Sequence, residues 1–183
     1  MESQSDAHEN SDGASQDEQI RRRTDEYARD LELNSWRQAE IHVTTAGFWG
    51  NFQWIFGGAA TVLAAAASAM AFSHYALAAG ILALCATGSA AIVTALRPGD
   101  LSAQHLKSAT EFNNLQNEAR DLWEFRLERL NVYQSRDEIG RLGRLWNEIM
   151  SRSPRVPRRL FKVTDVRYGK KGMYYFPRPR NNK

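Results

Sequence analysis

The chain has 183 residues, which is room for one domain with appendages. Its net charge of +3 hides an uneven distribution: residues 1–20 carry six acids and no Lys or Arg, residues 151–183 carry eleven Lys or Arg against one acid, and residues 41–96 carry no charge. The single cysteine, Cys85, excludes an internal disulfide and a CxxC metal or redox pair, and we interpret it as a small apolar packing residue.

The first 47 residues divide into a tail and a helix. Residues 1–19 lack aromatic residues, and lack large aliphatic ones after Met1, so we predict a disordered acidic tail. Residues 20–47 have near-helical spacing of their less polar positions. We expect this segment to run along or just beneath a membrane surface and to lead into a first span. The spaced positions are Ile20, Tyr27, Leu31, Asn34 and Gln38.

The charge-free stretch predicts two membrane spans, at residues 52–72 and 75–96, with Ser73 and His74 as the turn. A spanning helix needs about 20 apolar residues, because the hydrocarbon core is about 30 Å thick. The alternative is a buried helical hairpin in a soluble protein, for which this chain has too little other apolar material. A cleaved signal peptide is disfavoured because the stretch begins far from Met1 and is too long.

Aromatic residues cluster at the entry to the first span and at the far end of the hairpin, as expected at headgroup level. They are Phe48, Trp49, Phe52, Trp54 and Phe56 at the entry, and Phe72 and Tyr75 at the far end.

Small residues recur every four positions in both spans, which places each set on one helix face. Because small residues let helices approach closely in lipid, we predict helix packing along these faces, with accidental spacing in an alanine-rich sequence as the alternative. The sets are Gly57, Thr61, Ala65 and Ala69, and Ala79, Ala83, Thr87, Ala91 and Ala95.

The polar side chains that remain inside the spans are weakly polar hydroxyl groups. Thr61 and Ser68 are seven residues apart, as are Thr87 and Thr94, so each pair shares a face that an oligomer could turn toward a water-filled path. The alternative, which we favour, is that each hydroxyl bonds the carbonyl four residues back in its own helix.

After the Pro98-Gly99 exit, the sequence predicts a long amphipathic cytoplasmic helix over residues 102–134, with Ser102 as its N-cap. We expect the apolar face of this helix, which includes Phe112 and Leu115, to hold neighbouring copies together. Residues 135–183 should form a short helix followed by a basic tail rich in Pro, Arg and Lys.

The Lys and Arg residues next to the span ends predict the orientation of the protein in the membrane. Arg37, Arg97 and Lys107 lie outside the spans and the turn has no cation, so both termini should be cytoplasmic. We expect the basic tail to bind anionic lipid. Its aromatic residues leave nucleic-acid binding as an alternative; they are Tyr168, Tyr174, Tyr175 and Phe176.

The sequence contains no P-loop, GxGxxG, HExxH or GxSxG motif, so we expect no enzyme, no cofactor and no metal site. The absence of ionisable groups inside the spans also argues against coupled transport.

Short motifs flank the spans. Residues 36–42 read WRQAEIH, and residues 98–120 contain PGD, HLKSA, FNNL and NEAR. This arrangement resembles the SLATT family, the bacterial two-span effector domains associated with SMODS nucleotidyltransferases and SLOG sensor domains. The resemblance covers about residues 35–130. The positions matching the family motif are Arg37, His42, His105, Phe112 and Leu115.

The resemblance implies a role in anti-phage or conflict systems. A nucleotide signal, or a separate sensor partner, would trigger the protein to oligomerise and permeabilise the inner membrane, so that the infected cell dies or stops growing. His42 and His105 would lie just outside the spans, where they could face one another and bridge helices or respond to a ligand or pH. The rival hypothesis is a non-enzymatic membrane anchor or scaffold that recruits a cytoplasmic partner.

Overall fold

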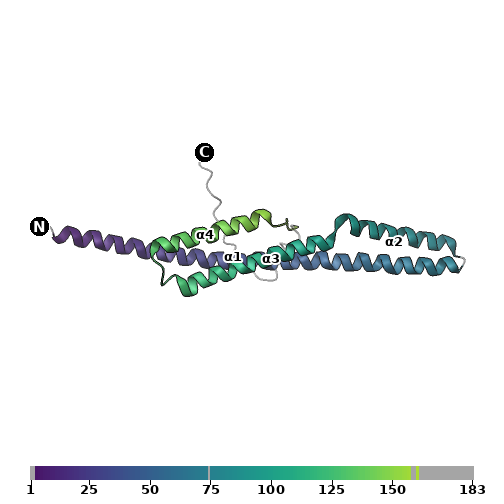
Figure 1. Ribbon diagram of the computed structural model, residues 1–183, viewed down its shortest axis with the longest axis horizontal. Helices are drawn as coiled ribbons and strands as arrows, with labels where there is room; N and C mark the ends of the chain where they lie inside the picture. The colour runs from purple at the N-terminus through teal and green to yellow at the C-terminus, as the bar shows by residue number, and fades with distance from the viewer. Residues whose placement is uncertain (1–2, 74, 158–159, 161–183) are drawn as a thin grey trace, which may run out of the picture.

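The computed structural model describes residues 3–73, 75–157 and 160, with side chains described from Gln16 onward. Within these residues all regular structure is helical. The elements are α1 (Ser3–Phe72), α2 (Ala76–Leu96), α3 (Pro98–Asp121), a short π-helix η1 (Leu122–Arg126) and α4 (Val132–Arg152). Helix α1 forms the axis of an elongated molecule, and the other helices lie along it (Figure 1). The aromatic part of the basic tail lies outside the described residues.

Helix α1 is continuous through 70 residues, or about 105 Å at 1.5 Å per residue. The segment 20–47 is therefore helical and leads directly into the apolar stretch, as predicted. Its position along or just beneath a membrane surface stays a prediction. Gly47 and Gly50 do not interrupt the helix, because an isolated glycine costs only about 1 kcal/mol relative to alanine and contacts with α3 support this region.

The beginning of α1 differs from the predicted disordered tail. The helix begins at Ser3, within the acidic segment. Extending an existing helix fixes one residue per added hydrogen bond, whereas starting one is costly, and negative charges near the N-terminus interact favourably with the helix dipole. The packed part of α1 thus provides a nucleus from which the polar segment continues.

The boundary between α2 and α3 is a single residue. Arg97 has a left-handed backbone conformation, with φ 45° and ψ 56°, and its N–H donates to Val93 O at 3.0 Å. Pro98 then opens α3, where its missing N–H costs nothing. The prediction that Ser102 caps this helix is wrong: Ser102 lies in the second turn, and its hydroxyl donates to Ala46 O in α1 at 2.9 Å.

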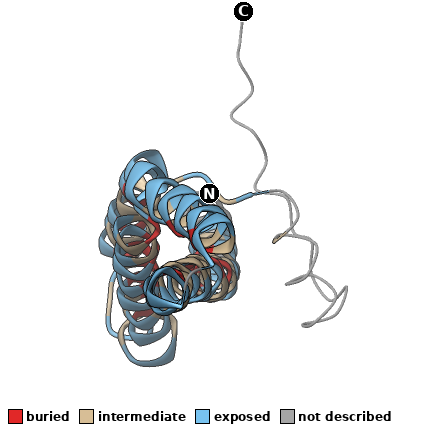
Figure 2. Ribbon diagram, turned by 90° about the vertical axis from the view of Figure 1, so that its right-hand side faces the viewer, coloured by how far each residue is buried: buried red, intermediate tan, exposed pale blue. Residues whose placement is uncertain are grey.

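Helices α1, α3 and α4 form a bundle whose core follows a heptad-like pattern, with apolar residues three and four apart on each helix. The buried residues lie on the sides of the helices that face one another (Figure 2). The core residues are Ala28, Leu31 and Ala39 of α1, Phe112, Leu115 and Ala119 of α3, Leu122 of η1, and Leu142 and Ile149 of α4. On α1 the buried face is offset from the positions that the sequence analysis singled out. Small residues such as Ala28, Ser35 and Ala39 make the contact, one position after Tyr27, Asn34 and Gln38.

The apolar face of α3 is used inside the chain. Phe112 and Leu115 are both fully buried between α1 and α4. The expectation that this face holds neighbouring copies together is therefore wrong. The sequence showed an apolar stripe without showing what covers it, and α4 folds back to cover it.

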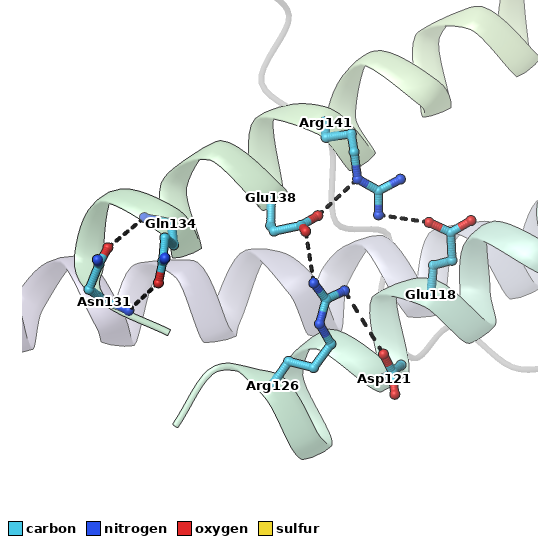
Figure 3. Close-up of polar contacts among 7 residues, drawn as sticks. All are labelled: Glu118, Asp121, Arg126, Asn131, Gln134, Glu138 and Arg141. Atoms are coloured by element: carbon cyan, nitrogen blue, oxygen red, sulfur yellow. Dashed lines mark hydrogen bonds and ion pairs between the residues drawn. The ribbon is translucent and has the colours of Figure 1, made fainter. Parts of the chain in front are cut away.

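The predicted helix over 102–134 also ends early. After η1 the chain turns, and α4 starts behind a capping box in which Asn131 Oδ1 accepts from Gln134 N–H and Gln134 Oε1 accepts from Asn131 N–H. Ion pairs join α4 to the end of α3 and to η1 (Figure 3). Arg126 contacts Glu138 at 2.8 Å, and Arg141 contacts both Glu138 and Glu118 at 2.8 Å. These arginines hold the pKa of Glu138 below its ordinary value.

The far end of the molecule is a two-helix hairpin of α2 against the last part of α1, separate from the bundle (Figure 1). Its buried positions, among the described residues, are all alanine: Ala67 in α1, and Ala79 and Ala86 in α2. Ala79 and Ala86 are seven residues apart, so the hairpin continues the heptad spacing of the bundle.

Candidate functional site at the junction of bundle and hairpin

Two histidines meet where the bundle ends and the hairpin begins. His42 of α1 and His105 of α3 are 2% and 1% exposed, and their Nδ1 atoms are 2.9 Å apart. One Nδ1 must carry a proton and donate, while the other accepts. The two residues are 63 positions apart in the chain, and the pairing of α1 with α3 brings them together.

Aromatic rings surround this pair. Phe112 stacks on His42, with ring centroids 5.7 Å apart, and Trp146 of α4 meets Phe112 edge-on at 5.4 Å. Burial lowers the pKa of His42 to about 4, with a further contribution from the nearby ring of His105. Burial likewise lowers the pKa of His105. Both rings are therefore neutral at neutral pH.

Two further contacts fix α3 against α1 on the hairpin side of the histidines. One is the hydrogen bond from Ser102 to Ala46 O. The other is the close approach of Gln53 to Gly99, where an added Cβ would collide with Gln53 Oε1. The α1–α3 interface thus continues past the histidines to the start of the apolar hairpin.

The other residues of the predicted family motif do not take part in the histidine–histidine hydrogen bond. Phe112 and Leu115 lie in the core, and Arg37 is partly exposed on α1 beside the histidine region. Sequence reasoning missed Trp146 as part of this site. Its place on the apolar side of the last helix was visible in the sequence, but its contact with the histidine stack depends on how α4 folds back.

The predicted pore-lining hydroxyls are all exposed on the hairpin and all bond within their own helix. Thr61 donates to Gly57 O, Ser68 to Ala64 O, Thr87 to Ala83 O and Thr94 to Ala90 O, at 2.8 to 3.0 Å. These are the local bonds that the alternative interpretation favoured. Each hydroxyl oxygen can still accept a further hydrogen bond, so pore lining stays a prediction.

The predicted small-residue faces are only partly used within the hairpin. Ala79 is buried there and Gly57 is half-buried, whereas Ala65, Ala69, Ala83 and Ala91 are exposed. The hairpin contact uses positions with heptad spacing instead. The four exposed alanines remain open to a second copy of the chain, and packing along them stays a prediction.

A groove of about 520 Å³ lies at the opposite end of the bundle, between α1 and the first turns of α4. Arg23 and Arg136 line it together with Tyr27 and Tyr133, and Asp17 stands among them. Neither arginine forms an ion pair with any described residue. Two free guanidinium groups beside phenol rings suit an anion that carries a flat ring.

Two of the described helices are long and apolar enough to cross a membrane. A core helix of a soluble protein is mostly buried, but the most apolar 18-residue windows here are only 6% and 11% buried within the chain. The fold thus defines an all-helical protein with two potential membrane-spanning helices. Comparisons with protein-family models, curated proteins and solved structures find no match.

Proposed function

We propose that this protein is a bacterial inner-membrane effector of a conflict or anti-phage system, which oligomerises and permeabilises the membrane when triggered. The observation that carries the proposal is the exposed apolar hairpin, continuous through α1 with a folded polar bundle. Trp54, Val62, Leu77 and Leu84 are 69 to 83% exposed there, and an apolar surface of this extent calls for lipid or another protein. No step of the proposed action requires an enzyme, cofactor or metal.

In this proposal both termini are cytoplasmic. The bundle and the basic tail lie on the cytoplasmic side, the tail binds anionic lipid, and the turn at Ser73 lies outside. The cation asymmetry around the charge-free stretch supports this orientation. The resemblance of residues 35–130 to SLATT domains supports the defence role.

The pore requires several copies, because two helices cannot enclose an aqueous path. Exposed alanines at positions 65, 69, 83 and 91 provide faces for close contact between hairpins. The hydroxyl groups at positions 61, 68, 87 and 94 would then line the path. Without charged groups such a path would discriminate poorly between ions.

The trigger is a nucleotide signal or a sensor partner that acts on the bundle. The groove between Arg23 and Arg136 supports the first possibility, because its chemistry suits a phosphate joined to a flat ring. A thermal-shift titration with ADP should stabilise the wild type and not an Arg23→Gln, Arg136→Gln double variant. No shift for the wild type would favour a sensor partner.

The proposal is tested by expressing the chain in bacteria with a membrane-potential dye, alongside crosslinking in isolated membranes. We expect depolarisation together with crosslinked oligomers. Ala83→Leu with Ala91→Leu should reduce both, whereas Leu84→Ile, on the same helix, should reduce neither. Stable insertion of an assembled protein without depolarisation, even alongside its genomic neighbours, would favour the scaffold hypothesis instead.

A further inference from the structure

The histidine pair has a property that a purely apolar contact would lack: its geometry tolerates one added proton but not two. In the neutral pair one Nδ1–H donates to the other Nδ1, 2.9 Å away. A first proton can bind Nε2 of the donating ring and leave this hydrogen bond in place. A second proton must bind the accepting Nδ1, and two N–H groups then point at each other.

The aromatic rings that pack beside the pair offer no acceptor for the displaced hydrogen bond. The neighbours on α3 and α4 are the apolar or aromatic rings of Phe112 and Trp146. The closest ionisable residues along α1 are Arg37 and Glu40, and those along α3 are Asp100, Lys107 and Glu111.

The charged side chains at the end of α4, Glu148 and Arg152, already have partners, and Arg155 just beyond the helix is a cation. Arg152 contacts Glu111 at 3.4 Å and Glu148 at 3.0 Å. Helix α2 has no ionisable group other than the thiol of Cys85. The pKa values of both histidines respond to burial, and that of His42 also to His105, with no contribution from a carboxylate. Two charges at this position would therefore lack a counterion.

We propose that His42 and His105 form a proton-operated joint, which holds α1 against α3 while the pair shares its hydrogen bond and releases them when both rings are protonated. The release would be transmitted to the hairpin, because α1 continues directly into it and α3 joins α2 through Arg97 alone. This inference rests on the contacts of the bundle and is independent of the proposed membrane activity.

The sign of the pH dependence follows from the lowered pKa values. The unfolded chain binds protons at its histidines near the ordinary value of 6.5, whereas folded His42 does so only at about 4. Stability from the neutral pair is thus complete above about pH 6.5 and is lost as the pH falls toward 4. Across this interval the lowered pKa of His42 alone should lower the folding equilibrium constant by about a hundredfold.

The test compares thermal unfolding of the full chain in detergent from pH 7.5 to 4 with that of a His42→Leu, His105→Leu double variant. The wild type should lose stability below pH 6.5, and the variant should lose much less. The ion pairs of Glu138 are common to both proteins, so the difference isolates the histidines. Identical pH profiles would overturn the proposal.

A second measurement covers the possibility that the double variant does not fold. Histidine ring signals can be followed by NMR in ¹³C-labelled wild-type protein and assigned with single His42→Gln and His105→Gln variants. In the folded protein both rings should titrate below their values in denaturant, and signals of α1 and α3 should shift together with the second step. Two rings that titrate as they do in denaturant would refute the joint.

Discussion

At the scale of single residues, the packed face of α1 is more polar than a bundle core needs to be. Thr24, Ser35, His42 and Thr45 are all buried on it. Thr24 and Thr45 donate to the carbonyls four residues back, and His42 meets His105. Only Ser35 Oγ, among the described buried side-chain atoms, lacks a partner.

Ser35 therefore offers a direct stability prediction. A buried hydroxyl without a hydrogen bond carries an uncompensated desolvation cost. Ser35→Ala removes that hydroxyl, keeps the small volume and has higher helix propensity, so we expect a gain of about 1 kcal/mol in the free energy of unfolding. Denaturant titration followed by circular dichroism measures it. Ser35→Val, which adds volume at a fully buried position, is the contrasting variant and should be destabilising.

At the scale of elements, some alanines of the hairpin are buried where its two helices pack together and others are exposed. Ala86 is buried between α1 and α2, whereas Ala83, three residues earlier, is exposed. Overpacking a close helix contact costs about 1–3 kcal/mol. Ala86→Leu should thus lower the melting temperature of the monomer in detergent, while Ala83→Leu should leave it unchanged. Equal effects of the two variants would show that the hairpin packs along a different face.

The capping box of Asn131 and Gln134 stabilises the start of α4, where the chain turns after η1. Asn131→Ala removes the side-chain acceptor for Gln134 N–H and should cost about 1 kcal/mol. Asn131→Asp keeps an acceptor and adds a favourable charge at the helix N-terminus, so it should cost little. The free energy of unfolding distinguishes the two variants. An equal loss for both would mean that the ion pairs of Arg126 and Arg141, rather than the cap, position α4.

At the scale of the whole molecule, the continuity of α1 connects the two ends. The helix passes from the bundle into the apolar hairpin without a break, while the return path has one break, at Arg97. Movement of α3 relative to α1 can therefore be taken up at a single residue. Arg97 already has φ 45°, a conformation that glycine adopts without cost.

The orientation of the molecule in a membrane can be tested with thiol labelling. In a Cys85→Ser background, a cysteine at Ser73 should react with an impermeant reagent added to the periplasm, whereas one at Ser153 should react only after the cells are opened. The physical reason is the absence of Lys and Arg at the turn and their presence on both outer flanks. The reverse pattern would place the bundle outside the cell. Recovery in the supernatant after carbonate extraction would contradict membrane insertion altogether.

The sequence by itself determined the helical class and the position of the apolar hairpin. Fifty-six consecutive residues without a charge, with Ser73 and His74 as the predicted turn, leave little other choice. It also showed the spacing of Phe112, Leu115 and Ala119, because helical period is a local property that one face of a helix displays without its partner.

Only the tertiary structure decided what each face touches. The sequence did not show that α4 covers Phe112, that α1 continues unbroken past Gly50, or that Ser102 bonds α1 instead of capping α3. Each of these depends on contacts between residues far apart in the chain, such as Phe112 with Trp146 and Ser102 with Ala46. The family resemblance raised the possibility that His42 and His105 face one another, but only the register of α1 against α3 sets the 2.9 Å between their nitrogens.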